Sequence, residues 1–129
     1  MDPWYASLAK PEWTPAPSTI GLIWTIVYPI ILVTFGVALV GMARGQIAWS
    51  VAVPIGINLA ANFAFTPIQF GMHNLTLAAV DIVIVLVTIV WCMVALWPYS
   101  PWYAVALLPY LVWVSTATVL QLSITFANR

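Results

Sequence analysis

Charged residues are almost absent from this chain of 129 residues, since aspartate, glutamate, lysine and arginine together make up 5% of it. Soluble domains carry about 25% charged residues, because a folded chain in water needs a polar surface. With 64% hydrophobic residues, this chain cannot present such a surface, and we expect it to lie in a lipid bilayer. The formal net charge is zero, so no nucleic-acid partner is indicated.

Cysteine and histidine are also scarce, with one of each, Cys92 and His73. A single cysteine excludes an intrachain disulfide and a cysteine-based metal site. Within its apolar run we interpret Cys92 as a small packing residue. The sequence provides no Ser/His/acid set, no cluster of metal ligands and no phosphate-binding loop. We therefore expect no metal site and no obligatory cofactor, and the sequence carries no enzyme signature.

Long apolar runs dominate what is present. A membrane-spanning helix needs roughly 20 mostly apolar residues, and four segments are long enough, at about residues 18–43, 47–70, 74–97 and 102–126. Their connections are short, so consecutive helices must be antiparallel neighbours. The predicted fold is all-α: a polytopic membrane bundle of four transmembrane helices in a single domain, residues 1–129, with an N-terminal loop at residues 1–17.

The positions of the few cationic residues predict how the chain is oriented in the membrane. Four spans put both termini on one side of the membrane, together with Lys10, His73 and Arg129. Arg44 falls on the other side. The positive-inside rule then places both termini in the cytoplasm. We expect a multi-pass protein of a bacterial inner, or intracytoplasmic, membrane.

Polar residues within the spans are informative because they are costly in hydrocarbon. Asp81 is the only acid in a span, and we expect it to face the bundle. One interpretation is a proton relay or a ligand partner; the other, which we favour because no span carries a basic partner, is a hydrogen-bonded clamp between helices. Asn58 and Asn62 are four residues apart and share a helix face, which Gln69 extends. They either join helices or orient the polar edge of a ligand.

Aromatic residues recur at helical spacing. Trp24 and Tyr28 are four residues apart, as are Trp113 and Ala117. Aromatic rings beside small residues leave room between helices, and large flat apolar ligands fit such clefts. Ordinary packing of a bundle produces the same spacing, so ligand binding at these residues is a hypothesis at this point.

The N-terminal stretch WYASLAKPEWTPAPSTIGLIWTIVY resembles the first loop and second helix of the TspO family, the translocator proteins also called peripheral-type benzodiazepine receptors or tryptophan-rich sensory proteins. The family pattern is W-Y-x-x-L-x-K-P-x-W-x-P-P, followed by W-T-x-x-Y. The matching residues are Trp4, Tyr5, Leu8, Lys10, Pro11, Trp13, Pro15, Trp24, Thr25 and Tyr28.

Three later segments extend the resemblance, in order, over nearly the whole chain. NLAANFAFTPIQFG is similar to N-x-x-W-T-P-x-F-F-G, LAAVDIVIVLVT to A-L-V-D-L-L-L, and LLPYLVWVSTATVLQ to P-Y-L-x-W-x-x-x-A-x-x-L-N. Two departures are expected to alter the pocket, because Phe65 replaces the tryptophan of W-T-P and Gln121 replaces the asparagine near the end. Family members have five helices, and the opening motif follows what would be their first. We expect that this helix is absent, trimmed or supplied by another polypeptide.

The resemblance implies a function and a site. The family binds tetrapyrroles such as protoporphyrin and heme, benzodiazepine-type drugs and, in some members, sterols, between helices and beneath the first loop. We therefore expect an integral membrane protein that binds, senses or delivers a tetrapyrrole or another hydrophobic ligand, with a porphyrin, heme or related pigment as that ligand. If the ligand-contacting positions of the family are carried over residue by residue, the resemblance implies a pocket formed by Tyr5, Trp13, Trp24, Tyr28, Asn62, Phe65, Asp81, Trp113 and Ala117.

Two alternatives stay open. Without the first helix of the family, the chain would expose a flank of the bundle to lipid or to a partner, as in a homodimer or an accessory subunit of a larger membrane assembly such as a photosynthetic pigment–protein complex. The other alternative is light-dependent breakdown of porphyrins, which the resemblance assigns to Tyr5, Trp24 and Trp113. Indoles and a phenol are oxidisable beside a photosensitiser, so this photochemistry is the most enzyme-like activity that we expect.

Overall fold

The first long helix, α2 (Pro17–Ala43), has a sequence signal at each end. In this computed structural model, which describes residues 3–128, the helix begins at a proline, whose fixed φ and missing N–H suit the first helical position. It ends at Ala43, and the turn that follows contains Gly45, where φ is 73°. The N–H groups of Gly45 and Gln46 donate to the carbonyls of Met42 and Gly41, at 3.1 and 2.8 Å. This left-handed glycine turn satisfies the last carbonyls of the helix.

The second span, expected as one helix at residues 47–70, consists of three pieces. A single 3₁₀ turn, η1 (Trp49–Val51), leads into α3 (Ala52–Thr66), and a π-helical turn, η2 (Pro67–Gly71), follows it. The proline that opens η2 has no N–H to continue the ladder of α3. The N–H of Met72 donates to the carbonyl five residues earlier, at 3.0 Å, which is the spacing of a π-helix.

The last two spans are uninterrupted helices, α4 (Leu75–Leu96) and α5 (Pro101–Ala127). Each begins at a capping side chain. The side-chain oxygens of Asn74 and Ser100 accept hydrogen bonds from N–H groups of the first turn, at 2.9 and 3.3 Å. Because the turns before these helices are so short, α3, α4 and α5 run antiparallel in succession.

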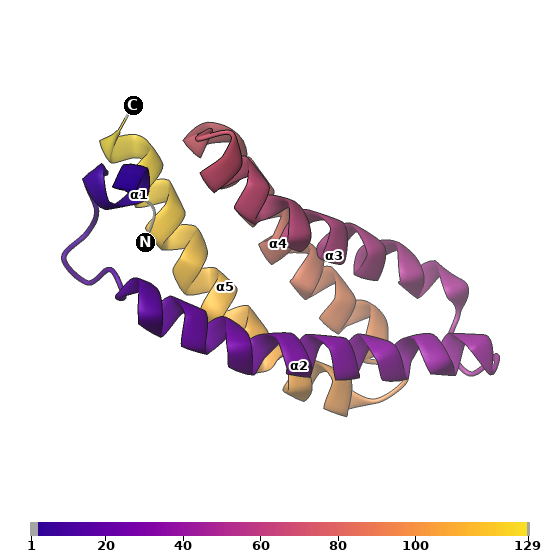
Figure 1. Ribbon diagram of the computed structural model, residues 1–129. Helices are drawn as coiled ribbons and strands as arrows, with labels where there is room; N and C mark the ends of the chain where they lie inside the picture. The colour runs from indigo at the N-terminus through magenta and orange to yellow at the C-terminus, as the bar shows by residue number, and fades with distance from the viewer. Residues whose placement is uncertain (1–2, 129) are drawn as a thin grey trace.

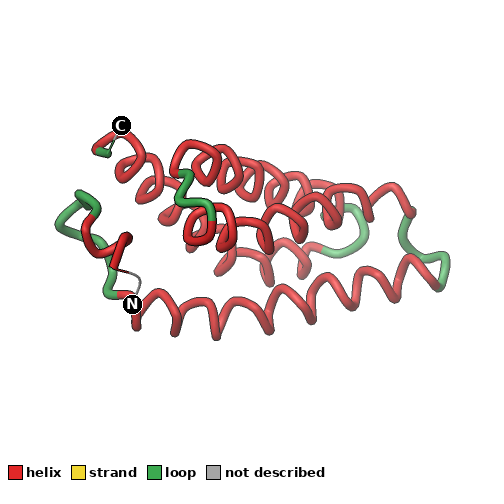
Figure 2. The backbone as a smooth tube through the Cα atoms, turned by 45° about the horizontal axis from the view of Figure 1, so that its top comes forward, coloured by secondary structure: helices red, strands yellow, loops and turns green. Residues whose placement is uncertain are grey.

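The helices pack around α4 and α5. α4 packs against both α3 and α5, and α2 packs mainly against α5. Figure 1 shows α2 crossing the bundle, and Figure 2 shows it along one side of the other three helices. The core between them contains large, fully buried side chains, among them Ile31, Phe35, Ile82, Ile89, Leu107 and Tyr110.

The outer surface of the bundle is apolar. Among the described residues, four spans are long and apolar enough to cross a membrane, at 18–43, 49–71, 75–96 and 101–127. Large apolar side chains such as Val33, Val94 and Val112 are about two thirds exposed, as expected for helices solvated by lipid. The prediction of an all-α membrane bundle with four transmembrane helices is therefore confirmed.

The N-terminal segment before α2 is partly helical. Within the expected loop at residues 1–17, the structure has a short helix, α1 (Pro3–Ser7). We call residues 3–16 the lid. Figure 1 shows α1 beside the C-terminal end of α5, where Tyr5 packs in a small cluster with Leu120 and Ile124.

Candidate ligand-binding site

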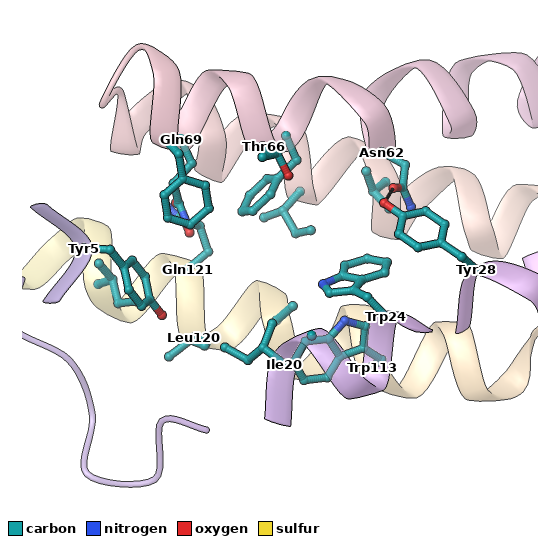
Figure 3. Close-up of a pocket in the computed structure, with 17 residues that line it drawn as sticks. Tyr5, Ile20, Trp24, Tyr28, Asn62, Thr66, Gln69, Trp113, Leu120 and Gln121 are labelled. Atoms are coloured by element: carbon teal, nitrogen blue, oxygen red, sulfur yellow. Dashed lines mark hydrogen bonds between the residues drawn. The ribbon is translucent and has the colours of Figure 1, made fainter. Parts of the chain in front are cut away.

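A cavity of about 410 Å³ lies between the helices. Its walls come from α2, α3, η2, α4 and α5, and Tyr5 of the lid adds to one end (Figure 3). The volume is within the range of about 300–1,000 Å³ that is usual for pockets that hold small molecules. None of the side chains that line it is an aspartate, glutamate, lysine, arginine or histidine. The cavity is thus an uncharged space inside a membrane bundle.

Aromatic rings of two helices form one end of the cavity, which we call the indole end. Trp24 stacks on Tyr28, one helical turn further along α2, with 5.1 Å between the ring centroids. Trp113 of α5 meets Trp24 edge to face at 6.0 Å, with an angle of 85° between the rings. The Nε1 atom of Trp113 is buried and has no hydrogen-bond partner among residues 3–128. These rings present flat apolar surface to the cavity.

A chain of hydrogen bonds fixes the polar edge of the indole end. The hydroxyl of Tyr28 donates to Oδ1 of Asn62, at 2.9 Å. Nδ2 of Asn62 donates to the hydroxyl of Tyr110 at 2.6 Å, and this hydroxyl donates to Oδ1 of Asn58 at 3.0 Å. Asn58 in turn donates to Oγ1 of Thr88, at 3.0 Å. The chain joins all four long helices, so it fixes the position of Tyr28 at the cavity wall.

Lys10 holds Tyr5 in place. Its ammonium group donates to the carbonyls of Tyr5 and Leu8 at the end of α1, at 2.8 and 3.0 Å, and lies 4.8 Å from the centroid of the Tyr5 ring. A helix of five residues is not stable alone, so these bonds help to keep it formed. Burial raises the pKa of the Tyr5 hydroxyl above its ordinary value of 10.0. The hydroxyl is therefore protonated at neutral pH and remains a hydrogen-bond donor.

The lid is attached to the bundle at two further points. The side chain of Asn128, just after α5, accepts from the N–H of Ala9 at 3.1 Å and donates to its carbonyl at 3.0 Å. The Trp4 ring stacks on His73 with 4.3 Å between centroids, and it meets Phe70 edge to face at 6.5 Å. His73 has φ 52°, a left-handed conformation that is uncommon for a residue with a side chain.

Comparison with known proteins decides the family. A sequence model described as the TspO/MBR family matches residues 1–127. The chain belongs to the TspO/MBR family.

Relatives come from bacteria and mammals. The chain is 34% identical to an uncharacterized membrane protein, YtaB, of Bacillus subtilis over 97% of its length, and the match covers 80% of that protein. It is 36% identical to the tryptophan-rich protein TspO of Bacillus cereus and 34% identical to the translocator protein of Homo sapiens. These matches cover 66% and 74% of the chain, but only 54% and 64% of the two relatives.

Most of the site residues that the TspO resemblance implies lie together. Trp13 and Asp81 do not line the cavity; Trp13 is half exposed on the lid, and Asp81 is buried on α4. No metal-binding group of three or more His, Cys, Asp or Glu occurs in the part of the chain that the structure describes. The residues from the implied site that do line the cavity are Tyr5, Trp24, Tyr28, Asn62, Phe65, Trp113 and Ala117.

Asp81 lies next to Ile82, whose side chain lines the cavity. The Oδ2 atom of Asp81 is buried without a hydrogen-bond partner among the described residues. The hydrogen-bonded clamp between helices, which we favoured from the sequence, is not formed by Asp81 with any described residue. Asn58 performs that role instead, by joining α3 to α4 and α5.

The cavity also has lining residues outside the implied set. Gln69, Phe70 and Gln121 surround the end near Tyr5, which we call the lid end. The sequence contained a signal for Gln69, since NFAFTPIQFG has glutamine where the TspO pattern has the first phenylalanine of F-F-G. Thr66 is a further polar lining residue, within the F-T-P segment. The other residues had no polar or aromatic signal that separates them from ordinary core positions: Ile20, Gly21, Ile82, Val85, Leu120 and Ile124.

Proposed function

We propose that this membrane protein of the TspO/MBR family binds a tetrapyrrole or another flat hydrophobic ligand in the cavity, in order to sense it or to deliver it. The observation that carries the proposal is the cavity itself, which is walled by aromatic rings at the indole end and covered by Tyr5 of the lid. The relatives of this chain include a tryptophan-rich protein TspO and translocator proteins. These names fit a binding role.

The lining favours a ligand whose buried part is apolar and planar. Stacked and edge-to-face rings at Trp24, Tyr28 and Trp113 offer surfaces for a conjugated macrocycle. No cationic side chain lines the cavity to pair with a carboxylate. The propionates of a porphyrin must therefore extend past the lid, where water can solvate them.

The lining also favours a metal-free ring over a heme. Heme iron in proteins takes histidine, cysteine, methionine or tyrosinate as axial ligand. No histidine, cysteine or methionine lines the cavity. Burial keeps the Tyr5 hydroxyl protonated by raising its pKa, which makes it a poor ligand for iron. The residues present support stacking and hydrogen bonding to a porphyrin rather than coordination of its metal.

Titration with protoporphyrin in detergent tests the proposal. We expect saturable quenching of the intrinsic tryptophan fluorescence and a shift of the porphyrin absorption band. Trp24→Ala combined with Trp113→Ala should abolish both changes, because it removes the two indoles that form the wall. The absorption shift is the decisive signal, since it does not depend on the tryptophans as reporters.

A matched control removes two tryptophans outside the cavity. Trp91 and Trp97 are 46% and 59% exposed and do not line the cavity. Trp91→Ala combined with Trp97→Ala should leave the absorption shift and the affinity unchanged. An unaltered shift in the Trp24/Trp113 variant, or its loss in the Trp91/Trp97 variant, would place the bound porphyrin outside this cavity and reject the proposal.

The lid end of the bundle is proposed to face the cytoplasm of a bacterial cell. Lys10 and His73 lie near that end, and Arg44 follows α2 at the other; Arg129 is outside the described residues. The positive-inside rule supports this orientation. A fluorescent protein fused after the last residue should fold and fluoresce, whereas alkaline phosphatase fused there should be inactive. The reverse result would invert the topology.

A further inference from the structure

The cavity is open toward one side of the bundle. Two of its lining residues are exposed, Gly21 of α2 and Thr66 of α3. The lining residues of α4 and α5 are buried, apart from the half-buried Ala117. Tyr5, which covers the lid end, is 8% exposed. The opening therefore lies between α2 and α3, along a line that we call the seam, and not beneath the lid.

The two sides of this opening lie within membrane spans. Gly21 belongs to the span at residues 18–43, close to its start, and Thr66 to the span at residues 49–71, close to its end. At 1.5 Å per residue, both lie roughly 5–8 Å inside the ends of the spans, measured along the helices. A Cβ at Gly21 would meet no heavy atom of another part of the chain within 4 Å. The opening thus faces the hydrocarbon of the bilayer.

Tyr28 closes the seam on the side away from the lid. Its hydroxyl donates to Oδ1 of Asn62 on α3, at 2.9 Å (Figure 3). Its ring stacks on Phe63, with 6.3 Å between the centroids and 18° between the planes. Phe63 is 56% exposed and does not line the cavity. Adjacent helices lie about 8–10 Å apart, so a conjugated macrocycle passes between α2 and α3 only when this ring contact opens.

Opening of the seam costs less than opening of the lid. The lid is held by two hydrogen bonds between Asn128 and Ala9 and by the stack of Trp4 on His73, and its opening also removes Tyr5 from an apolar cluster. At the seam, one pair of rings separates. Lipid tails are as apolar as the surfaces that this separation exposes, so no apolar surface is transferred to water there.

We propose that ligands enter and leave the cavity sideways, from the hydrocarbon of the bilayer, through the seam between α2 and α3, with the Tyr28–Phe63 contact as the gate. This inference rests on the proposed function, since it requires that the cavity binds a small molecule. It goes further by assigning the route and the source of the ligand, which is a compound dissolved in the membrane. The lid stays closed during this exchange.

The rates of binding and release test the route. We would mix the full chain in lipid nanodiscs with excess protoporphyrin by stopped flow and follow the shift of the porphyrin absorption band. Dilution into excess empty nanodiscs gives the rate of release. Phe63→Ala should accelerate binding and release alike, by roughly two- to tenfold, which is the range that one aromatic contact supplies. The affinity should change by less than about twofold, because Phe63 does not line the cavity.

Two control variants separate the seam from the lid and from shortening of a side chain in general. Asn128→Ala combined with Trp4→Ala removes the hydrogen bonds to Ala9 and the stack on His73, and it should leave both rates unchanged. Ile57→Ala shortens a side chain on the same helix as Phe63 that is 41% exposed and outside the lining. It should also leave both rates unchanged.

Two features of the design exclude other causes. With ligand in excess, a rate constant does not depend on the folded fraction of the sample, which affects only the amplitude of the signal. Trp24→Ala combined with Trp113→Ala provides the baseline for porphyrin that dissolves in the bilayer without entering the cavity. A loss of folding or simple partitioning therefore does not imitate a faster gate.

The outcomes distinguish this inference from the proposed function. If the wild type shows no absorption shift above the baseline, both are overturned. If it does, unchanged rates in Phe63→Ala, or unequal changes of its two rates, overturn the lateral route and leave the proposed function standing. Faster exchange in the Asn128/Trp4 variant or in Ile57→Ala has the same consequence, because the route would then lie beneath the lid or be unspecific.

Discussion

The hydroxyl of Tyr110 accepts a 2.6 Å hydrogen bond from Nδ2 of Asn62 and thereby joins α5 to α3 in the middle of the bundle. The same hydroxyl donates to Asn58, one turn away on α3. Tyr110 is fully buried, so water cannot replace these bonds. Its hydroxyl connects the cavity wall at Tyr28 with the contact between α3 and α4.

Removal of this hydroxyl should destabilise the bundle. Tyr110→Phe leaves Asn62 Nδ2 and Asn58 Oδ1 without their partner, and an orphaned buried polar group costs about 1–3 kcal/mol. We expect a lower unfolding temperature in detergent, measured by circular dichroism. Tyr103→Phe is the matched control, because the half-buried Tyr103 makes no hydrogen bond to another described residue through its hydroxyl. Equal effects of the two substitutions would contradict the role of the network.

Asn128 should control how tightly the lid is held. Asn128→Ala removes both hydrogen bonds to Ala9, at 3.1 and 3.0 Å. We expect faster hydrogen exchange of the amides at residues 3–16, measured by mass spectrometry, with little change in α3 and α4. Ser123→Ala, near the end of α5, is the control, since the Ser123 hydroxyl bonds only to its own helix at Val119. Unchanged exchange in the Asn128 variant would show that the other lid contacts suffice.

Closure of the lid should weaken at alkaline pH. Burial raises the pKa of Tyr5 in the closed lid above 10.0, so the closed state favours the neutral phenol. This contribution to closure is fully present below about pH 10 and is lost as pH rises through the pKa of the closed state. A nitroxide spin label attached at Ala6→Cys should become more mobile in that pH range. In a variant that also carries Tyr5→Phe, this increase in mobility should be smaller. An identical pH profile in the Tyr5 variant would contradict this linkage.

Two glycines should respond to alanine with opposite signs. Gly45 has φ 73°, so Gly45→Ala strains the turn after α2 and should destabilise the protein by about 1 kcal/mol or more. Gly56 is inside α3, and a Cβ there meets nothing within 4 Å. Gly56→Ala should therefore stabilise the helix by up to about 1 kcal/mol. Thermal unfolding in the same detergent measures both, and a shift of the same sign for both would contradict the turn geometry.

The four spans could be predicted from the sequence because hydropathy and length determine them almost alone. The shared face of Asn58 and Asn62 could also be predicted from their spacing, and the structure places both at the Tyr110 hydroxyl. Tyr110 itself had no signal, since a tyrosine in an apolar helix is interpreted equally well as packing. Its role depends on how α5 packs against α3, which is a tertiary property.

The local breaks in the helices were harder to predict. A proline such as Pro67 interrupts the hydrogen-bond ladder of a helix, but whether the chain forms a kink or a π-helical turn depends on which carbonyl accepts the next N–H. The direction of Gln69 depends on that choice. α1 was missed because five residues have no helical period to detect, and its stability comes from Lys10 and from packing on α5.

The candidate site was accessible from the sequence only through family resemblance. Spacing alone gave pairs such as Trp24 and Tyr28, which ordinary packing explains as well. The resemblance joined residues of the lid and four helices into one set, and seven of its nine members line one cavity. Binding by these residues remains a prediction, and Trp13 and Asp81 lie outside the lining.

The most direct test is native mass spectrometry of the protein purified from its own membrane in mild detergent. We predict that the wild type retains a hydrophobic small molecule, identified by its mass and absorption spectrum, and that Trp24→Ala combined with Trp113→Ala loses it. The Trp91/Trp97 variant should retain it. Wild-type protein that carries lipid alone, or a pigment retained equally by the Trp24/Trp113 variant, would contradict ligand binding in this cavity.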